Sequence, residues 1–188
     1  MKPLSVLTGA LAGLVLAFGG AFAQQSSPPG RPDTKTIGDW QVRCFPVENP
    51  NPCDVFQERG DSRTQQRILT VSLAFAPSLN RHLLQITVPV GVALQRGLTI
   101  QADSYTSPVM KYRMCSREGC FVQVVPDNAV IEALTKAGSD AKINIVADGG
   151  KSFSLPLSLK GFSAAHDDMV TQARAKAKPE KAGDTAKP

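Results

Sequence analysis

The stretch Tyr112-Arg-Met-Cys-Ser-Arg-Glu-Gly-Cys-Phe-Val-Gln-Val-Val125 holds two strand-like runs on either side of a short polar turn. Cys115 and Cys120 stand at the two ends of that turn. The other two of the four cysteines, Cys44 and Cys53, enclose a second short loop. Strand-like runs joined by turns with a cysteine at each end predict an all-β domain with two local disulfides.

The N-terminus predicts export. A basic start, Met1-Lys2, precedes an apolar run from Leu4 to Phe18, and Ala21-Phe-Ala23 supplies the small residues that signal peptidase accepts. The apolar run is shorter than the roughly 20 residues that a membrane span needs. We therefore predict a signal peptide over residues 1–23 and a soluble mature protein with no transmembrane span. Its expected location is the periplasm, the outer membrane surface or the exterior of the cell.

Export bears on the cysteines, because an oxidising compartment and an even count favour disulfides over a metal site. Pairing Cys44 with Cys53 and Cys115 with Cys120 is favoured, since each pair closes a short loop. A crossed pairing stays open, because longer loops gain somewhat more stability in the chain-entropy model. The C-x8-C and C-x4-C spacings fit poorly with a thiol redox site or with paired zinc-binding cysteines. We expect no metal and no cofactor.

Composition divides the chain into a leader, one domain and a tail. Residues 24–36 are rich in proline and serine and predict a flexible leader. Residues 37–166 are expected to form the β-domain, and residues 167–188 an Ala/Lys-rich tail that is partly helical or disordered. Propensity alone allows a helix from about Ser163 to Lys176, but its apolar face is thin.

Alternating apolar residues predict about nine or ten short antiparallel strands in the domain. The expected strands cover residues 37–45, 53–59, 67–75, 81–88, 97–102, 108–115, 120–125, 141–147 and 152–159. One short helix is expected after Asp127 or Asn128, either of which can serve as N-cap, with Gly138 just past its end. This pattern predicts a β-sandwich or a closed β-barrel.

Four short sequence motifs occur in the same order as in the invasion-associated locus B family of exported bacterial proteins, which the chain therefore resembles. They are Gly38-Asp-Trp40 leading to Cys44, Val88-Pro-Val-Gly-Val-Ala-Leu94, Cys115-x3-Gly119-Cys120, and Gly161-Phe-Ser-Ala-Ala165. The resemblance runs from about Thr36 to Met169. It implies an exported all-β protein, associated with the cell envelope, that binds or scaffolds an envelope or host component and is not an enzyme. It carries over no catalytic residues.

No motif in the sequence indicates a catalytic centre. His82 and His166 are the only histidines, neither has the context of a serine-histidine-acid triad, and we interpret both as surface residues. The sequence contains no nucleophile elbow and no phosphate-binding glycine loop. The net charge of +5 comes from charges mixed along the chain, which argues against a nucleic-acid partner. A small periplasmic enzyme with a dispersed active site remains the alternative.

The turn between Cys115 and Cys120 is the one candidate interaction loop. A disulfide there would hold out Ser116, Arg117 and Glu118, where they could meet a partner, although we expect them to meet only water. Trp40 lies close in sequence to Cys44, and a lone tryptophan beside a disulfide in a β-domain is expected in the core.

Overall fold

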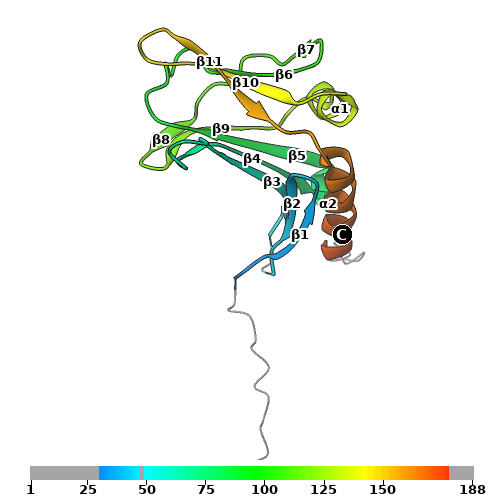
Figure 1. The fold of residues 1–188 in the computed structure, drawn as a ribbon. Helices are drawn as coiled ribbons and strands as arrows, with labels where there is room; N and C mark the ends of the chain where they lie inside the picture. Colours follow the sequence, from blue (N-terminus) through cyan, green and yellow to red (C-terminus); the bar gives the residue numbers. More distant parts are fainter. Residues whose placement is uncertain (1–29, 47–48, 178–188) are drawn as a thin grey trace, which may run out of the picture.

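A computed structural model describes residues 30–46 and 49–177 of the chain. These residues form two antiparallel β-sheets and two α-helices (Figure 1). The predicted signal peptide, most of the predicted leader and the last residues of the predicted tail lie outside the described residues. The all-β prediction is therefore confirmed as a sandwich-like arrangement of two sheets.

The larger sheet has seven strands in the order β1-β2-β3-β4-β5-β9-β8. Its strands are β1 (Asp33–Ile37), β2 (Trp40–Cys44), β3 (Cys53–Gly60), β4 (Arg67–Ala76), β5 (Arg81–Val88), β8 (Met114–Ser116) and β9 (Gly119–Val124). A 3-10 turn, Pro77–Leu79, joins β4 to β5. Period-two alternation buries Leu69, Val71, Leu73 and Phe75 of β4, which places one face of the sheet against the core.

The smaller sheet has four strands in the order β11-β10-β6-β7. They are β6 (Leu98–Ala102), β7 (Tyr105–Thr106), β10 (Ala141–Val146) and β11 (Ser152–Leu157). Both sheets are open, with β1 and β8 at the edges of the larger and β11 and β7 at the edges of the smaller. The closed-barrel alternative is therefore wrong.

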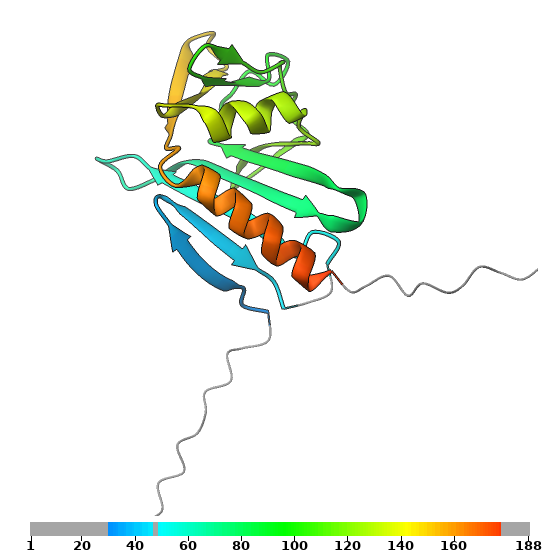
Figure 2. The ribbon, with the colours of Figure 1, turned by 90° about the vertical axis from the view of Figure 1, so that its right-hand side faces the viewer.

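The two helices complete the core (Figure 2). Helix α1 (Asn128–Lys136) lies beside the smaller sheet and buries Val130, Ile131 and Leu134. Helix α2 (Phe162–Lys176) packs across β1 to β4. Trp40 is fully buried, its ring centroid lies 4.8 Å from that of Phe162, and its Nε1 donates to the Ser158 carbonyl at 2.9 Å. The tryptophan is a core residue, as expected.

The predicted strand over residues 37–45 is in fact two strands and a turn. Strand β1 begins at Asp33, inside the predicted leader, and Gly38 reverses the chain at a φ of +60°. A β-carbon at Gly38 would collide with the Lys160 carbonyl oxygen, and one at Gly161 would collide with Ile37. These two glycines let the β1–β2 turn pack directly on the start of α2.

Helix α2 also places the end of the domain later than predicted. The expected boundary at residue 166 falls inside the helix, and Met169 and Ala173 beyond it are fully buried. The domain thus has a second helix beside the one expected there, and it covers the residues 163–176 for which propensity allowed a helix. The predicted strand over residues 108–115 is reduced to β8, because Met110 forms a bridge to Leu98 of the smaller sheet and the chain rejoins β9 only where the Arg113 amide donates to the Phe121 carbonyl.

Candidate functional site

Both predicted disulfides are present in their local pairing. Cys115 and Cys120 are directly opposite in the β8–β9 register, with Cα atoms 4.0 Å apart. Cys44 and Cys53 are likewise opposite between β2 and β3, with Cα atoms 4.1 Å apart. The crossed pairing is therefore excluded. The Cys44–Cys53 disulfide is fully buried, whereas the Cys115–Cys120 disulfide joins the strands of a hairpin and its Cys115 is exposed.

The tip of the β8–β9 hairpin is held from several directions. The Glu118 amide donates to Ser116 Oγ at 3.1 Å, and the Glu118 carbonyl accepts from Arg67 Nη2 of β4 at 3.1 Å. Gly119 has a φ of +141°, and a β-carbon there would collide with the Val88 carbonyl of β5. The glycine therefore lets the hairpin lie directly against β5.

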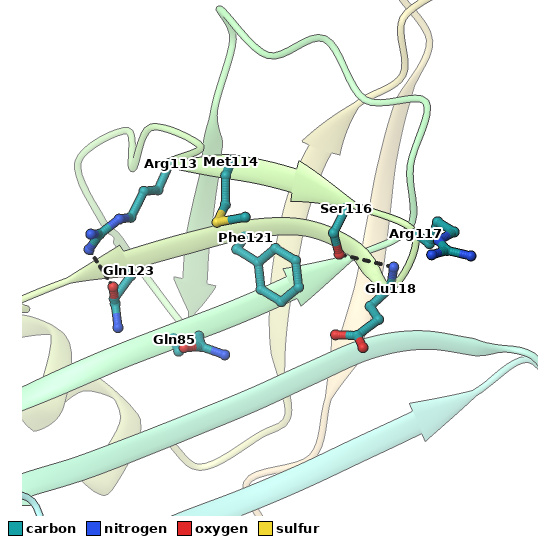
Figure 3. A pocket seen from close by; sticks show the side chains of 8 residues that line it. All are labelled: Gln85, Arg113, Met114, Ser116, Arg117, Glu118, Phe121 and Gln123. Carbon is teal, nitrogen blue, oxygen red and sulfur yellow. Dashed lines mark hydrogen bonds between the residues drawn. The ribbon is translucent and has the colours of Figure 1, made fainter.

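An open hollow of about 630 Å³ lies beside this tip (Figure 3). Its lining comprises Gln85, Arg113, Met114, Phe121, Gln123 and the three residues of the predicted interaction loop, Ser116, Arg117 and Glu118. Strands β5, β8 and β9 bring these side chains together on the face of the larger sheet that points away from the core. The expectation that this loop meets only water stays a prediction, and the loop borders this open hollow.

The hollow combines an apolar floor with polar sides. Phe121 and Met114 are directly opposite each other across β8 and β9, and Met114 is 57% exposed. Gln85 and Gln123 are directly opposite across β5 and β9. Arg113 Nη1 donates to Gln123 Oε1 at 2.6 Å, which fixes the orientation of that carboxamide. The alternation of β9 could have indicated that Phe121 and Gln123 share a face, but their partners on β5 depend on long-range register.

A second, more apolar hollow of about 480 Å³ adjoins the first and shares Arg113 and Gln123 with it. Val109 and Val125 line it and are more than half exposed. Tyr112 also lines it, and its hydroxyl is buried with no hydrogen-bond partner among the described residues. Burial raises the pKa of Tyr112 to about 12, so the phenol stays protonated and able to donate.

The two histidines meet, which the sequence did not indicate. His82 at the start of β5 and His166 in α2 place their Nε2 atoms 3.0 Å apart. His166 has a side chain only 14% exposed, so its interpretation as a surface residue is wrong. Burial, together with the charge of His166, lowers the pKa of His82 to about 4. Neither histidine lines the hollow.

The described residues hold neither a metal-binding cluster nor a membrane-spanning helix. No group of three or more His, Cys, Asp or Glu side chains among them is placed to hold a metal ion. No helix in the same part of the chain is long and apolar enough to cross a membrane.

Comparison with known proteins gives a consistent result over most of the chain. Residues 40–170 match the family model described as invasion associated locus B (IalB) protein. Two invasion protein B homologues of Brucella abortus, from strain 2308 and from biovar 1 strain 9-941, are each 31% identical over 152 residues. Each alignment covers 78% of this chain and 84% of the relative.

The fold also matches an experimental structure. The crystal structure of invasion associated protein B from Bartonella henselae superposes with a TM-score of 0.64 at 21% identity. The match covers 74% of this chain and 96% of the other. At that identity the likeness concerns the fold.

Proposed function

This chain belongs to the invasion-associated locus B family, and on that premise we propose that it is an exported, non-enzymatic protein that binds or scaffolds a component of the cell envelope or of a host. Export is supported by the basic start, apolar run and Ala21-Phe-Ala23 of the N-terminal sequence. Two disulfides further support an oxidising location, the periplasm or beyond. The relatives carry the name invasion protein, and a role in invasion is not part of this proposal.

The observation that carries the binding role is the hollow at the hairpin tip. Ser116, Arg117 and Glu118 border an open hollow, and Figure 3 shows the Glu118 carboxylate turned toward its other lining side chains. The Cys115–Cys120 disulfide and the Arg67 contact fix the tip before any partner arrives. A site ordered in advance loses less conformational entropy on binding, which favours affinity.

The alternative, a small periplasmic enzyme, has less support. General acid–base catalysis needs a group that takes up a proton and a group that releases one near the reacting atoms. Glu118 is the one carboxylate among the residues that line the hollow, and the histidine pair lies outside that lining. The side chains of the hollow are therefore better suited to hydrogen-bond a ligand than to turn it over.

The test is affinity capture from an envelope fraction with the immobilised mature protein. An R117A/E118Q variant removes the Arg117 side chain and the negative charge of Glu118, both at exposed positions that border the hollow. An E132Q/K136A variant removes one of each from the exposed ion pair on α1 and serves as the matched control.

We expect a component that the unchanged protein and the α1 variant retain and that the R117A/E118Q variant loses. Equal capture by all three proteins, or no enrichment over blank beads, would count against binding through this site. An assay of the same preparations against generic hydrolase substrates is expected to show no turnover.

A further inference from the structure

The polar groups of the hairpin hollow indicate what class of ligand it takes (Figure 3). Gln85 has a half-buried carboxamide with no hydrogen-bond partner among the described residues. Gln123 uses its oxygen to accept from Arg113 and keeps its NH2 group free within the same part of the chain. A carboxamide offers both donors and an acceptor, so this facing pair suits a ligand whose groups both donate and accept.

The charges around the hollow favour a neutral ligand. In Figure 3 the Glu118 carboxylate turns toward the lining side chains, whereas Arg117 projects away from them. Glu118 forms no ion pair among the described residues, and Arg113 lies on the opposite side, bonded to Gln123. An anion or a cation would meet one charge of its own sign and one of the opposite sign, so neither gains from the two groups together. A hydroxyl group satisfies both, because it donates to the one and accepts from the other.

The floor of the hollow supplies a flat apolar surface. The Phe121 ring lies between the two glutamines on one side and Ser116 and Glu118 on the other. Phe121 is half-buried, so one part of the ring is held by the sheet while the rest stays open to a ligand. A sugar ring has hydroxyl groups around its rim and C–H groups on its faces, which matches an aromatic ring surrounded by amide and carboxylate groups.

The size of the hollow fits a short saccharide. Its volume of about 630 Å³ is within the range of roughly 300–1,000 Å³ that holds small ligands. From the facing glutamines, the balanced charge and the open aromatic ring, we infer that this hollow is a binding site for a neutral oligosaccharide of about two or three sugar units. The inference rests on the proposed binding function and names its ligand class.

The test is a heteronuclear NMR titration of the mature protein with chitotriose, maltotriose and cellotriose. Side-chain amide signals of Gln85 and Gln123 report on the site directly. We expect saturable shifts of these signals, and of backbone amides from Ser116 to Phe121, with at least one trisaccharide. The variants Gln85→Ala and Phe121→Leu are each expected to weaken binding about tenfold, because one removes a hydrogen-bonding group and the other the flat ring.

Gln41→Ala is the matched control. Gln41 is an exposed glutamine of β2, three strands away from Gln85 in the same sheet and outside the lining of the hollow. Its replacement is expected to leave the affinity unchanged. Glu118→Gln alters only an exposed tip residue, so it tests the site even where a β9 substitution disturbs folding.

Three results would overturn the saccharide inference. The first is no shift at the hollow with any of the trisaccharides, and the second is a shift that Gln85→Ala and Glu118→Gln leave unaltered. The third is a response of the same signals to an extended Thr-Val repeat hexapeptide but to none of the sugars. The third result would keep the hollow as a binding site, whereas equal capture of envelope components by the R117A/E118Q variant would count against the binding function itself.

Discussion

His82 and His166 join strand β5 to helix α2 through Nε2 atoms 3.0 Å apart, although they are 84 positions apart in the sequence. At that separation one nitrogen must carry the proton and the other must accept it. Asp167 Oδ1 lies 3.2 Å from His166 Nδ1. When His166 Nδ1–H donates a hydrogen bond to that carboxylate, its Nε2 accepts one from His82 Nε2–H. Doubly protonated rings would repel each other at this contact.

This contact predicts that acid weakens the fold. Burial and His166 lower the pKa of His82 from 6.5 to about 4. Between these two pH values His82 therefore binds a proton in the unfolded chain but not in the folded chain. The stabilisation is complete above pH 6.5 and is lost as the pH falls toward 4. Because the ring is only partly buried, we expect a loss on the order of 1–2 kcal/mol.

Urea unfolding at pH 7.5 and pH 4.5 checks the prediction. His82→Gln removes the titrating ring, so the variant should lose less stability between the two pH values than the unchanged protein. Carboxylates titrate equally in both proteins, which makes the difference between them the informative quantity. Identical pH dependence in the two proteins would show that the histidine contact does not control it.

The hairpin disulfide predicts a second measurable loss. Replacing both Cys115 and Cys120 by alanine opens a loop with a sequence separation of 5, and the chain-entropy model expects a cost of about 2 kcal/mol. Replacing Cys44 and Cys53 should cost more, about 3 kcal/mol in the same model. A further loss of stability is expected because alanine leaves unfilled the space of two fully buried sulfur atoms. Urea unfolding of the two double variants compares them.

The two double variants should differ in how much of the structure they disturb, because one disulfide lies in a hairpin and the other in the core. The hairpin variant is expected to keep a folded core while the amide signals around the hollow broaden. A hairpin variant as stable as the unchanged protein, with sharp signals there, would contradict a role for the disulfide in ordering the tip. Four reactive thiols in the native protein would contradict both disulfides.

How much of this fold the sequence predicts depends on the kind of interaction that forms each element. Strand β4 shows period-two alternation because one face is buried along its whole length. Strand β1 is exposed at four of its five positions, so no alternation marks it, and the sequence alone places residues 33–36 in the leader. Helix α2 buries two alanines beside Phe162 and Met169, a surface too small to stand out by hydropathy.

The site depends on register even more strongly. The loop between Cys115 and Cys120 was identified because its cysteines are close in sequence. Gln85 joins it only because β5 pairs with β9, in a register that places Gln85 opposite Gln123, 38 positions later in the sequence. The same holds for the histidine pair. Local patterns carry no information on such pairings, which tertiary packing decides.

A third prediction concerns the outer face of the larger sheet, where Asp54 is almost fully buried. Arg43 donates to both its carboxylate oxygens, and Ser72 Oγ donates to it at 2.7 Å. Asp54→Ala leaves the Arg43 guanidinium, which lies 3.7 Å over the Phe56 ring, without its partner. We expect a loss of roughly 2–3 kcal/mol in urea unfolding.

Asp33→Ala is the control for that change. Asp33 is an exposed carboxylate of β1 whose ion pair with Lys176 spans 3.9 Å. An exposed pair of this kind contributes little, so its loss should be within about 0.5 kcal/mol of zero. Equal effects of the two substitutions would show that the network around Asp54 adds nothing beyond an ordinary surface charge.

The last prediction tests whether the domain includes helix α2 beyond residue 166. Ala173 is fully buried against the sheet, while Ala175, two positions later, is exposed. Ala173→Glu would bury a carboxylate without a partner and should cost at least about 3 kcal/mol or prevent folding. Ala175→Glu changes the same residue type to the same charge on the solvent side, so it should alter stability by less than about 0.5 kcal/mol. Thermal unfolding followed by circular dichroism separates the two, and equal midpoints would mean that the helix is an appendage rather than part of the core.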